Sequence, residues 1–208
     1  MADHEGVIKF DLHYLASPAE PGPALDELLQ WRDVFFQLGV IGQDPARYEG
    51  YAFGNISYRL GSGNQFVISG SQTGGLSHCL AEHYSVVDAC DVETNRVDAH
   101  GPIAPSSESL THGAIYALCG DIQCVVHGHA PKLWSNAEVL DIPATASEVA
   151  YGTPQMAHAI ETLYREHGRP RQALFAMLGH EDGIIAYGDG FAAIETMWNE
   201  TTRRAESI

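Results

Sequence analysis

Basic residues are scarce in this sequence, and their scarcity argues against several classes of protein. Lysine and arginine together number 11, aspartate and glutamate number 27, and the formal net charge of the 208 residues is −16. We therefore do not expect nucleic acid or an anionic membrane surface as the main partner. A small anion remains an acceptable ligand, because backbone N–H groups and hydroxyls bind phosphate whatever the total charge.

Long apolar runs and paired cysteines are also missing. No run of about 18 apolar residues occurs, so no membrane-spanning helix is predicted. The N-terminus does not begin with basic residues followed by an apolar stretch, so we expect no secretory signal and a cytoplasmic protein. The four cysteines form no Cys-x-x-Cys pair, and we expect them to be small hydrophobic residues rather than disulfides.

Hydrophobic patterning predicts helices interleaved with strand hairpins, and hence a mixed sheet with helices packed against it. We expect helices at residues 24–39, 107–118, 154–167 and 191–204, with Ser106 as the N-cap of the second. Strands are expected at residues 51–60, 65–69, 84–90, 95–99, 122–127, 173–178 and 183–188. Residues 1–23 are interpreted as an N-terminal arm containing a short strand, and residues 24–208 as one domain.

The motif His127-Gly128-His129 ends an apolar strand and predicts a metal site. In a strand, residues i and i+2 face the same side, so two imidazoles can share one metal ion. Zinc binds imidazole nitrogen at about 2.0–2.1 Å. The alternative is two surface histidines at a strand end. A cupin would normally carry a glutamate a few residues downstream, which residues 132–134 do not supply.

A carboxylate, Glu108, follows Pro105-Ser106-Ser107 at a predicted helix start. The helix dipole favours a carboxylate there, so an ordinary acidic helix start is one interpretation. A functional role is the other, because His112 at i+4 is a potential hydrogen-bond partner.

Two further groups of residues complete the candidates. His180 lies at a predicted strand end beside a loop, where site residues often occur, and is a candidate third ligand. Several loop residues carry N–H and O–H donors that can bind an anion, although each is also typical of a simple turn. These residues are Asn55, Thr73, Gly74, Ser106 and Ser107.

The order and spacing of these motifs resemble the class II aldolase/adducin family. Pro-Ser-Ser-Glu is followed by His-Gly-His nineteen positions after Glu108, and then by a histidine before a Gly-Ile-Ile strand. The Gly-Asn-Ile-Ser segment, the Thr-Gly loop and the Ile-Pro-Ala…Tyr-Gly-Thr stretch fit the same order, from about residue 25 to the C-terminus. The resemblance implies a three-layer α/β/α sandwich around a mostly antiparallel sheet, and a homotetramer with sites at subunit interfaces.

The resemblance also implies a chemistry. One divalent metal, commonly zinc, with manganese or cobalt as alternatives, is expected on His127, His129 and His180. Glu108 is expected to act as acid/base and to hold the metal when substrate is absent. The five loop residues are expected to bind the phosphate of a substrate. The implied activity is a lyase (aldolase) that cleaves a hydroxylated ketone such as a sugar phosphate through a metal-stabilised enediolate.

Three departures from the family pattern leave the reaction open. The chain has His180-Glu181-Asp182-Gly183 where the family often has His-Gly, and its segment 142–152 is shorter. Family aldolases take a tyrosine across the subunit interface, where this chain has Ser147; Tyr151 or a residue of a neighbouring subunit is the candidate substitute. A pentulose-phosphate 4-epimerase, a methylthioribulose-phosphate dehydratase and an adducin-like scaffold without metal remain alternatives.

Overall fold

The computed structural model describes residues 6–208, which form an eight-stranded sheet in the order β1-β7-β6-β5-β4-β8-β10-β9. Neighbouring strands are antiparallel except for the parallel pair of β1 and β7, so the sheet is mostly antiparallel as predicted. Its strands are β1 (Asp11–Ala16), β4 (Asn55–Arg59), β5 (Phe66–Ser69), β6 (Tyr84–Asp91), β7 (Arg96–Gly101), β8 (Cys124–His129), β9 (Ala173–Ala176) and β10 (Gly183–Gly188).

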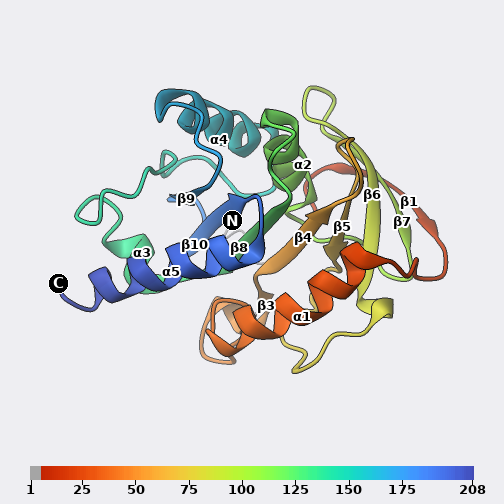
Figure 1. Ribbon diagram of the computed structural model, residues 1–208, viewed down its shortest axis with the longest axis horizontal. Coiled ribbons are helices and arrows are strands. Elements are labelled where there is room, and N and C mark those ends of the chain that lie inside the picture. Colours follow the sequence, from red (N-terminus) through yellow and green to blue (C-terminus); the bar gives the residue numbers. More distant parts are fainter. Residues whose placement is uncertain (1–5) are drawn as a thin grey trace.

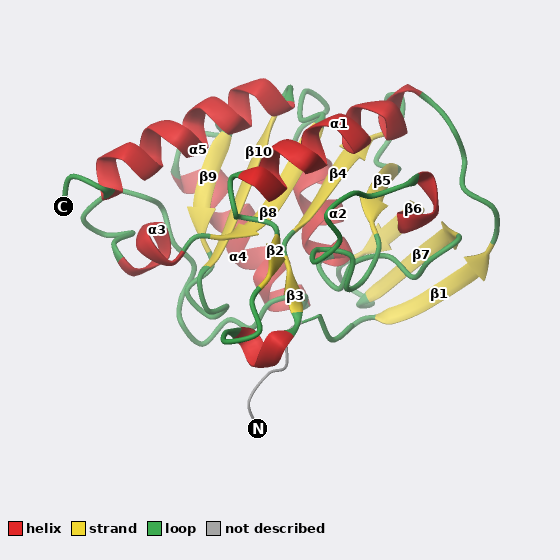
Figure 2. Ribbon diagram, turned by 90° about the horizontal axis from the view of Figure 1, so that it is seen from below, coloured by secondary structure: helices red, strands yellow, loops and turns green. Residues whose placement is uncertain are grey.

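Helices cover both faces of this sheet and make a three-layer α/β/α arrangement (Figure 1). Helices α1 (Pro23–Gln37) and α5 (Phe191–Ala205) pack on one face, and α2 (Ser109–Leu118) and α4 (Pro154–Glu166) on the other. Figure 2 shows the short helix α3 (Pro131–Ser135) near one end of α5, and the small sheet of β2 (Gly42–Gln43) and β3 (Ala52–Phe53). Short 3-10 turns occur at Tyr48–Gly50 and Ala81–His83.

The core is divided by the central strand β8, whose residues are all buried. Val126 packs with Leu28 and Trp198 in the cluster under α1 and α5, whereas Val125 packs with Ile160 in the cluster under α4. Because side chains alternate across a strand, a strand buried on both faces needs apolar residues at consecutive positions. Within β8, the polar residues His127 and His129 follow this apolar run at the end of the strand.

Some predicted boundaries were wrong. Helix α2 begins at Ser109, and Glu108 rather than Ser106 is its N-cap residue, because residues 106–109 first form a turn in which the Ser109 N–H donates to the Ser106 carbonyl. The strand predicted at 51–60 is interrupted at Gly54, whose φ of +77° only glycine adopts without strain.

Four other expectations concern His180, the N-terminal strand, the cysteines and membrane-spanning helices. His180 does not end a strand, because β9 stops at Ala176 and the histidine lies in the turn that follows. The predicted N-terminal strand is present as β1, while residues 1–5 of the predicted arm lie outside the described residues. All four cysteines are free thiols. Over residues 6–208, no helix combines the length and apolarity needed to cross a bilayer.

Candidate metal centre

The end of β8 presents His127 and His129 on the same side of the sheet, with ring centroids 5.3 Å apart. Gly128 between them packs closely on the opposite side. A Cβ at this position would lie 2.7 Å from the carbonyl oxygen of Val40 and 3.1 Å from the Trp198 ring. The glycine therefore lets the strand sit against α5 while both imidazoles face away from it.

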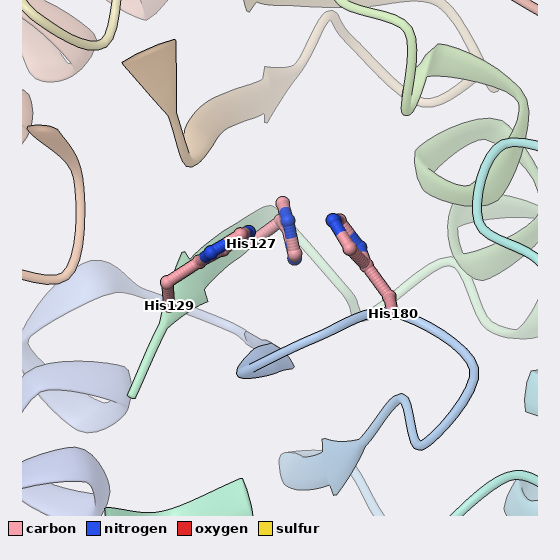
Figure 3. Close-up of side chains that lie close together, drawn as sticks. All are labelled: His127, His129 and His180. Atoms are coloured by element: carbon pink, nitrogen blue, oxygen red, sulfur yellow. The ribbon is translucent and has the colours of Figure 1, made fainter. Parts of the chain in front are cut away.

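His180 completes a group of three buried imidazoles (Figure 3). Its ring centroid is 4.9 Å from those of both His127 and His129, and one ring nitrogen of each residue lies within 4.8 Å of the others. The turn that carries it is closed by hydrogen bonds from His180 N to Met177 O and from Gly183 N to His180 O, each 2.9 Å. Ligand nitrogens around a tetrahedral zinc lie about 3.3 Å apart, so small side-chain rotations would bring these atoms to coordinating distance.

Hydrogen bonding gives His127 the tautomer that a metal ligand needs. Its Nδ1 donates to the carbonyl oxygen of Ile184 on β10 at 3.1 Å. The proton is therefore on Nδ1, and the lone pair is on Nε2, a buried atom without a hydrogen-bond partner. Metal-bound histidines commonly donate their other ring N–H in this way. The orphaned Nε2 thus fits a cation.

Burial also keeps the imidazoles in the uncharged form. Desolvation, followed by the proximity of His180, holds the pKa of His127 and that of His129 well below the usual range for histidine. Neutral imidazole is the form that binds a metal. A neutral donor set of this composition suits zinc, cobalt, nickel or copper better than calcium or magnesium.

Glu108 lies beside the histidines at the start of α2. It is 1% exposed, and its Oε1 is 3.5 Å from Nδ1 of His180. The predicted contact with His112 was wrong: Nδ1 of that histidine is 2.7 Å from the Ser57 hydroxyl, and its Nε2 has no hydrogen-bond partner. The carboxylate therefore faces the imidazole group instead of its own helix.

Four of the five predicted anion-binding residues line one small cavity. Backbone bonds join the two loops that form it, including the one from Ser71 N to Ala104 O at 2.9 Å. The cavity measures about 20 Å³, which holds one or two water molecules. Its lining includes Gly6, Asn55, Gly74, Ser106 and Ser107. Thr73 differs, because its hydroxyl turns back to donate to the Gly70 carbonyl at 2.8 Å.

An aromatic wall that we did not predict surrounds His129. The Tyr48 ring meets the imidazole edge-on at 4.4 Å, and the Phe53 ring stacks on it at 5.0 Å. The Tyr48 hydroxyl donates to Asp182, and Arg47 pairs with the same carboxylate oxygen. Burial and the Asp182 carboxylate raise the pKa of Tyr48, so the phenol stays protonated. The sequence signal for the contact of Tyr48 and Arg47 with Asp182 was the insertion of Glu181 and Asp182 after His180.

Tyr151 connects the histidines to the N-terminal part of the chain. Its buried ring stacks on His180 with centroids 4.5 Å apart. The Val7 N–H donates to its hydroxyl at 3.1 Å, and Nζ of Lys9 lies 3.6 Å from its ring centroid. Ser147, the residue aligned with the family tyrosine, is exposed, with its hydroxyl 3.5 Å from the Glu148 carboxylate. The N-terminal arm therefore reaches the candidate site of its own chain.

Comparisons with known proteins identify the family and the fold. The family profile described as "Class II Aldolase and Adducin N-terminal domain" matches residues 46–208. An L-fuculose 1-phosphate aldolase has a similar structure, with a TM-score of 0.65, 18% identity, and coverage of 91% of this chain and 88% of that chain. YgbL of Klebsiella pneumoniae, described as "a putative aldolase/epimerase/decarboxylase", gives a TM-score of 0.62 at 19% identity over 89% of this chain and 87% of that chain. Among curated proteins, none matches the sequence.

Proposed function

The chain belongs to the class II aldolase and adducin family. We propose that it is a divalent-metal-dependent lyase whose substrate is a sugar phosphate with a hydroxylated ketone group, which it cleaves by a retro-aldol reaction. The observation that carries this proposal is the meeting of three buried imidazoles with a buried carboxylate beside them. In a purely structural core, Nε2 of His127 would stay buried without a hydrogen-bond partner. A bound cation offsets that cost.

We assign the metal ligands to His127, His129 and His180, with Glu108 as a fourth when substrate is absent. The bound metal, with zinc as our first choice and manganese or cobalt as alternatives, supplies Lewis-acid polarisation of the ketone and hydroxyl oxygens of the substrate. The donor set supports this choice, because imidazole binds a metal in its neutral form and therefore leaves the net positive charge of the cation available to the substrate.

Glu108 is the proposed acid/base. Retro-aldol cleavage needs a base to take the proton of the hydroxyl beside the bond that breaks, and an acid to return a proton to the new carbanion carbon. The carboxylate is buried next to the imidazoles, so solvent does not compete for the proton. A further proton donor is either Tyr151, whose ring stacks on His180, or a residue of a neighbouring subunit.

The substrate phosphate is assigned to the cavity lined by Asn55, Gly74, Ser106 and Ser107, with Thr73 holding the loop from behind. We also propose a cytoplasmic homotetramer with sites at its subunit interfaces, acting on a small molecule without nucleic acid or membrane. The domain boundary at residues 23–24 remains part of the same proposal.

Epimerase and dehydratase activities on related phosphates would use the same residues, and identification of the products by NMR separates them from an aldolase. An adducin-like scaffold would not need the ligand set. Protein purified without a histidine tag should carry about one metal per chain, and metal content below about 0.2 per chain would favour the scaffold. Release of aldehyde from ketose phosphates with added zinc, manganese or cobalt tests the reaction itself.

A further inference from the structure

A buried arginine, Arg32 of α1, lies behind the candidate anion cavity and has no role in the proposal so far. It is 1% exposed, and its guanidinium lies over the Phe36 ring at 4.6 Å. Its Nη2 donates to the carbonyl oxygens of Thr73 and Gly74, at 3.2 and 2.8 Å. Burying a guanidinium costs free energy unless it is well hydrogen-bonded. The burial of Arg32 therefore needs a structural or functional explanation.

The two hydrogen bonds fix the orientation of the loop. In a trans peptide the N–H points in the direction opposite to the carbonyl. Because the carbonyls of Thr73 and Gly74 face Arg32, the N–H groups of Gly74 and Gly75 face away from it. Successive N–H groups aimed in one direction make a concave anion site.

Close packing keeps the loop in that orientation. A Cβ at Gly74 would lie 2.4 Å from the carbonyl oxygen of Phe53 and 3.0 Å from that of Gly42. Gly74 also lines the cavity assigned to the substrate phosphate. The residues described as lining that cavity include no lysine and no arginine, so an anion there would otherwise depend on uncharged donors alone.

The charge of Arg32 is only partly offset locally. The nearest carboxylate in an ion pair with it is Asp33, 3.7 Å from Nη1 and itself about one-third exposed. Nη1 is buried and has no hydrogen-bond partner. The guanidinium therefore places a net positive charge behind the peptide groups of Thr73 and Gly74, and this charge reinforces the positive end of their dipoles.

We propose that Arg32 is a positioning residue of the anion site: it orients the N–H groups of Gly74 and Gly75 and supplies positive charge behind them for the phosphate of the substrate. The inference rests on the proposed function, since it assumes that this cavity takes the phosphate. It explains how a chain of net charge −16 binds an anion without a cation in direct contact.

Binding of inorganic phosphate to the metal-loaded protein, followed by calorimetry or 31P NMR, tests the inference. Arg32→Met keeps the volume of the side chain and removes its charge and donors. We expect its dissociation constant for phosphate to rise at least about tenfold, because hydrogen bonds to a charged group are strong, while the metal content stays at the wild-type level. Arg32→Lys keeps the charge but cannot reach both carbonyls as effectively, so we expect an intermediate value, and this variant also serves if Arg32→Met does not fold.

Arg59 provides a matched control. It is another arginine, 2% exposed, that donates to backbone carbonyls, including those of Ile122 and Tyr116, but it does not line the cavity. Arg59→Met should lower thermal stability and leave phosphate affinity unchanged. If Arg59→Met and Arg32→Met weakened phosphate binding equally, the loss of affinity would reflect lower protein stability alone, and the inference would be overturned.

The remaining outcomes separate this inference from the proposed function. Wild-type affinity for phosphate in Arg32→Met would overturn the positioning role and leave the proposed function intact. Failure of the wild-type protein to bind inorganic phosphate at tens of millimolar would overturn both the positioning role and the phosphate assignment. The metal-dependent lyase chemistry is judged independently of either result, by metal content and aldehyde release.

Discussion

The hydroxyl of Tyr48 donates a 2.5 Å hydrogen bond to the carboxylate of Asp182, and this bond ties a loop before β3 to the turn that carries His180. The backbone carbonyl of Asp182 also accepts from the N–H of Ala130, the residue after His129. Because the Tyr48 ring also contacts His129 edge-on, the Asp182 carboxylate positions the His129 imidazole indirectly, through Tyr48. Asp182, the second of the two residues inserted after His180, is thus tied to the histidine group.

Asp182→Asn should therefore weaken metal binding without removing a ligand. The amide keeps the size of the side chain but loses the charge that pairs with Arg47. Changes to residues that orient metal ligands typically cost 10–100-fold in affinity, and we expect about tenfold here. Competition with a metal-binding dye measures it. The neighbouring exposed residue gives the control, because Glu181→Gln should not change the metal affinity. If Asp182→Asn bound metal as tightly as Glu181→Gln, Asp182 would have no role in orienting the metal ligands.

His129→Ala should abolish most metal binding. The substitution leaves two imidazoles of the three that lie within 4.8 Å of one another, and structural or catalytic zinc sites rarely have fewer than three protein ligands. We expect metal content below about 0.2 per chain after dialysis, measured by elemental analysis. His167→Ala, at an exposed position after α4, should retain the wild-type content. Full metal occupancy in His129→Ala would disprove the ligand assignment.

Glu108→Gln should separate metal binding from turnover. The amide occupies the same space at the start of α2, so the three histidines remain in place. It cannot exchange a proton, and general acid–base catalysis contributes about 10²–10⁴-fold, so aldehyde release should fall by that factor. Metal content, measured on the same sample, should stay near one per chain. A near-normal rate with metal bound would assign the proton transfer to another residue.

The histidine group could be predicted largely from sequence because local geometry fixes it. Residues i and i+2 of a strand lie on the same face whatever the fold, so the side chains of His127 and His129 necessarily lie side by side. His180 required the order of the family motifs, since fifty-one positions separate it from His129. Its turn then packs against β8 through the antiparallel pairing of β8 with β10.

Tertiary contacts explain what the sequence did not predict. Arg32 is in the middle of an amphipathic helix, where an arginine normally faces solvent, and only the loop at residues 73–74 makes it a buried donor. Tyr48 has a positive φ of 49° in an irregular segment, a conformation that no local pattern indicates. Glu108 faces His180 instead of His112 because the helix begins two residues later than the pattern predicted.

Acid should destabilise the metal-free protein through its buried histidines. Burial lowers the pKa of His112 to about 3, while an unfolded histidine titrates near 6.5. The unfolded state therefore binds the proton first, and the stability is present above about pH 6.5 and is lost as the pH falls toward the folded-state pKa. Below pH 6, each such histidine should contribute about 1 kcal/mol of lost unfolding free energy per pH unit.

Urea unfolding between pH 7.5 and 5 measures this slope. His112→Gln removes one proton-binding site from the unfolded state without restoring a charge to the core, so its slope should be shallower than that of the wild-type protein. His167→Gln changes an exposed histidine and should leave the slope unchanged. A slope in His112→Gln equal to that of the wild type would show that this histidine is not buried in its neutral form.

Tyr151→Phe tests the link between the N-terminal arm and the candidate site. The phenyl ring can keep its stacking on His180, but the Val7 N–H loses its acceptor. Amide exchange at Val7, followed by NMR, should become faster, because that N–H is then open to water.

If the hydroxyl is the proton donor of the lyase, aldehyde release should fall by about 10²–10⁴-fold at unchanged metal content. Faster exchange with a normal rate would instead assign the donor to a neighbouring subunit. Tyr187→Phe is the control, since that buried hydroxyl has no hydrogen-bond partner to lose.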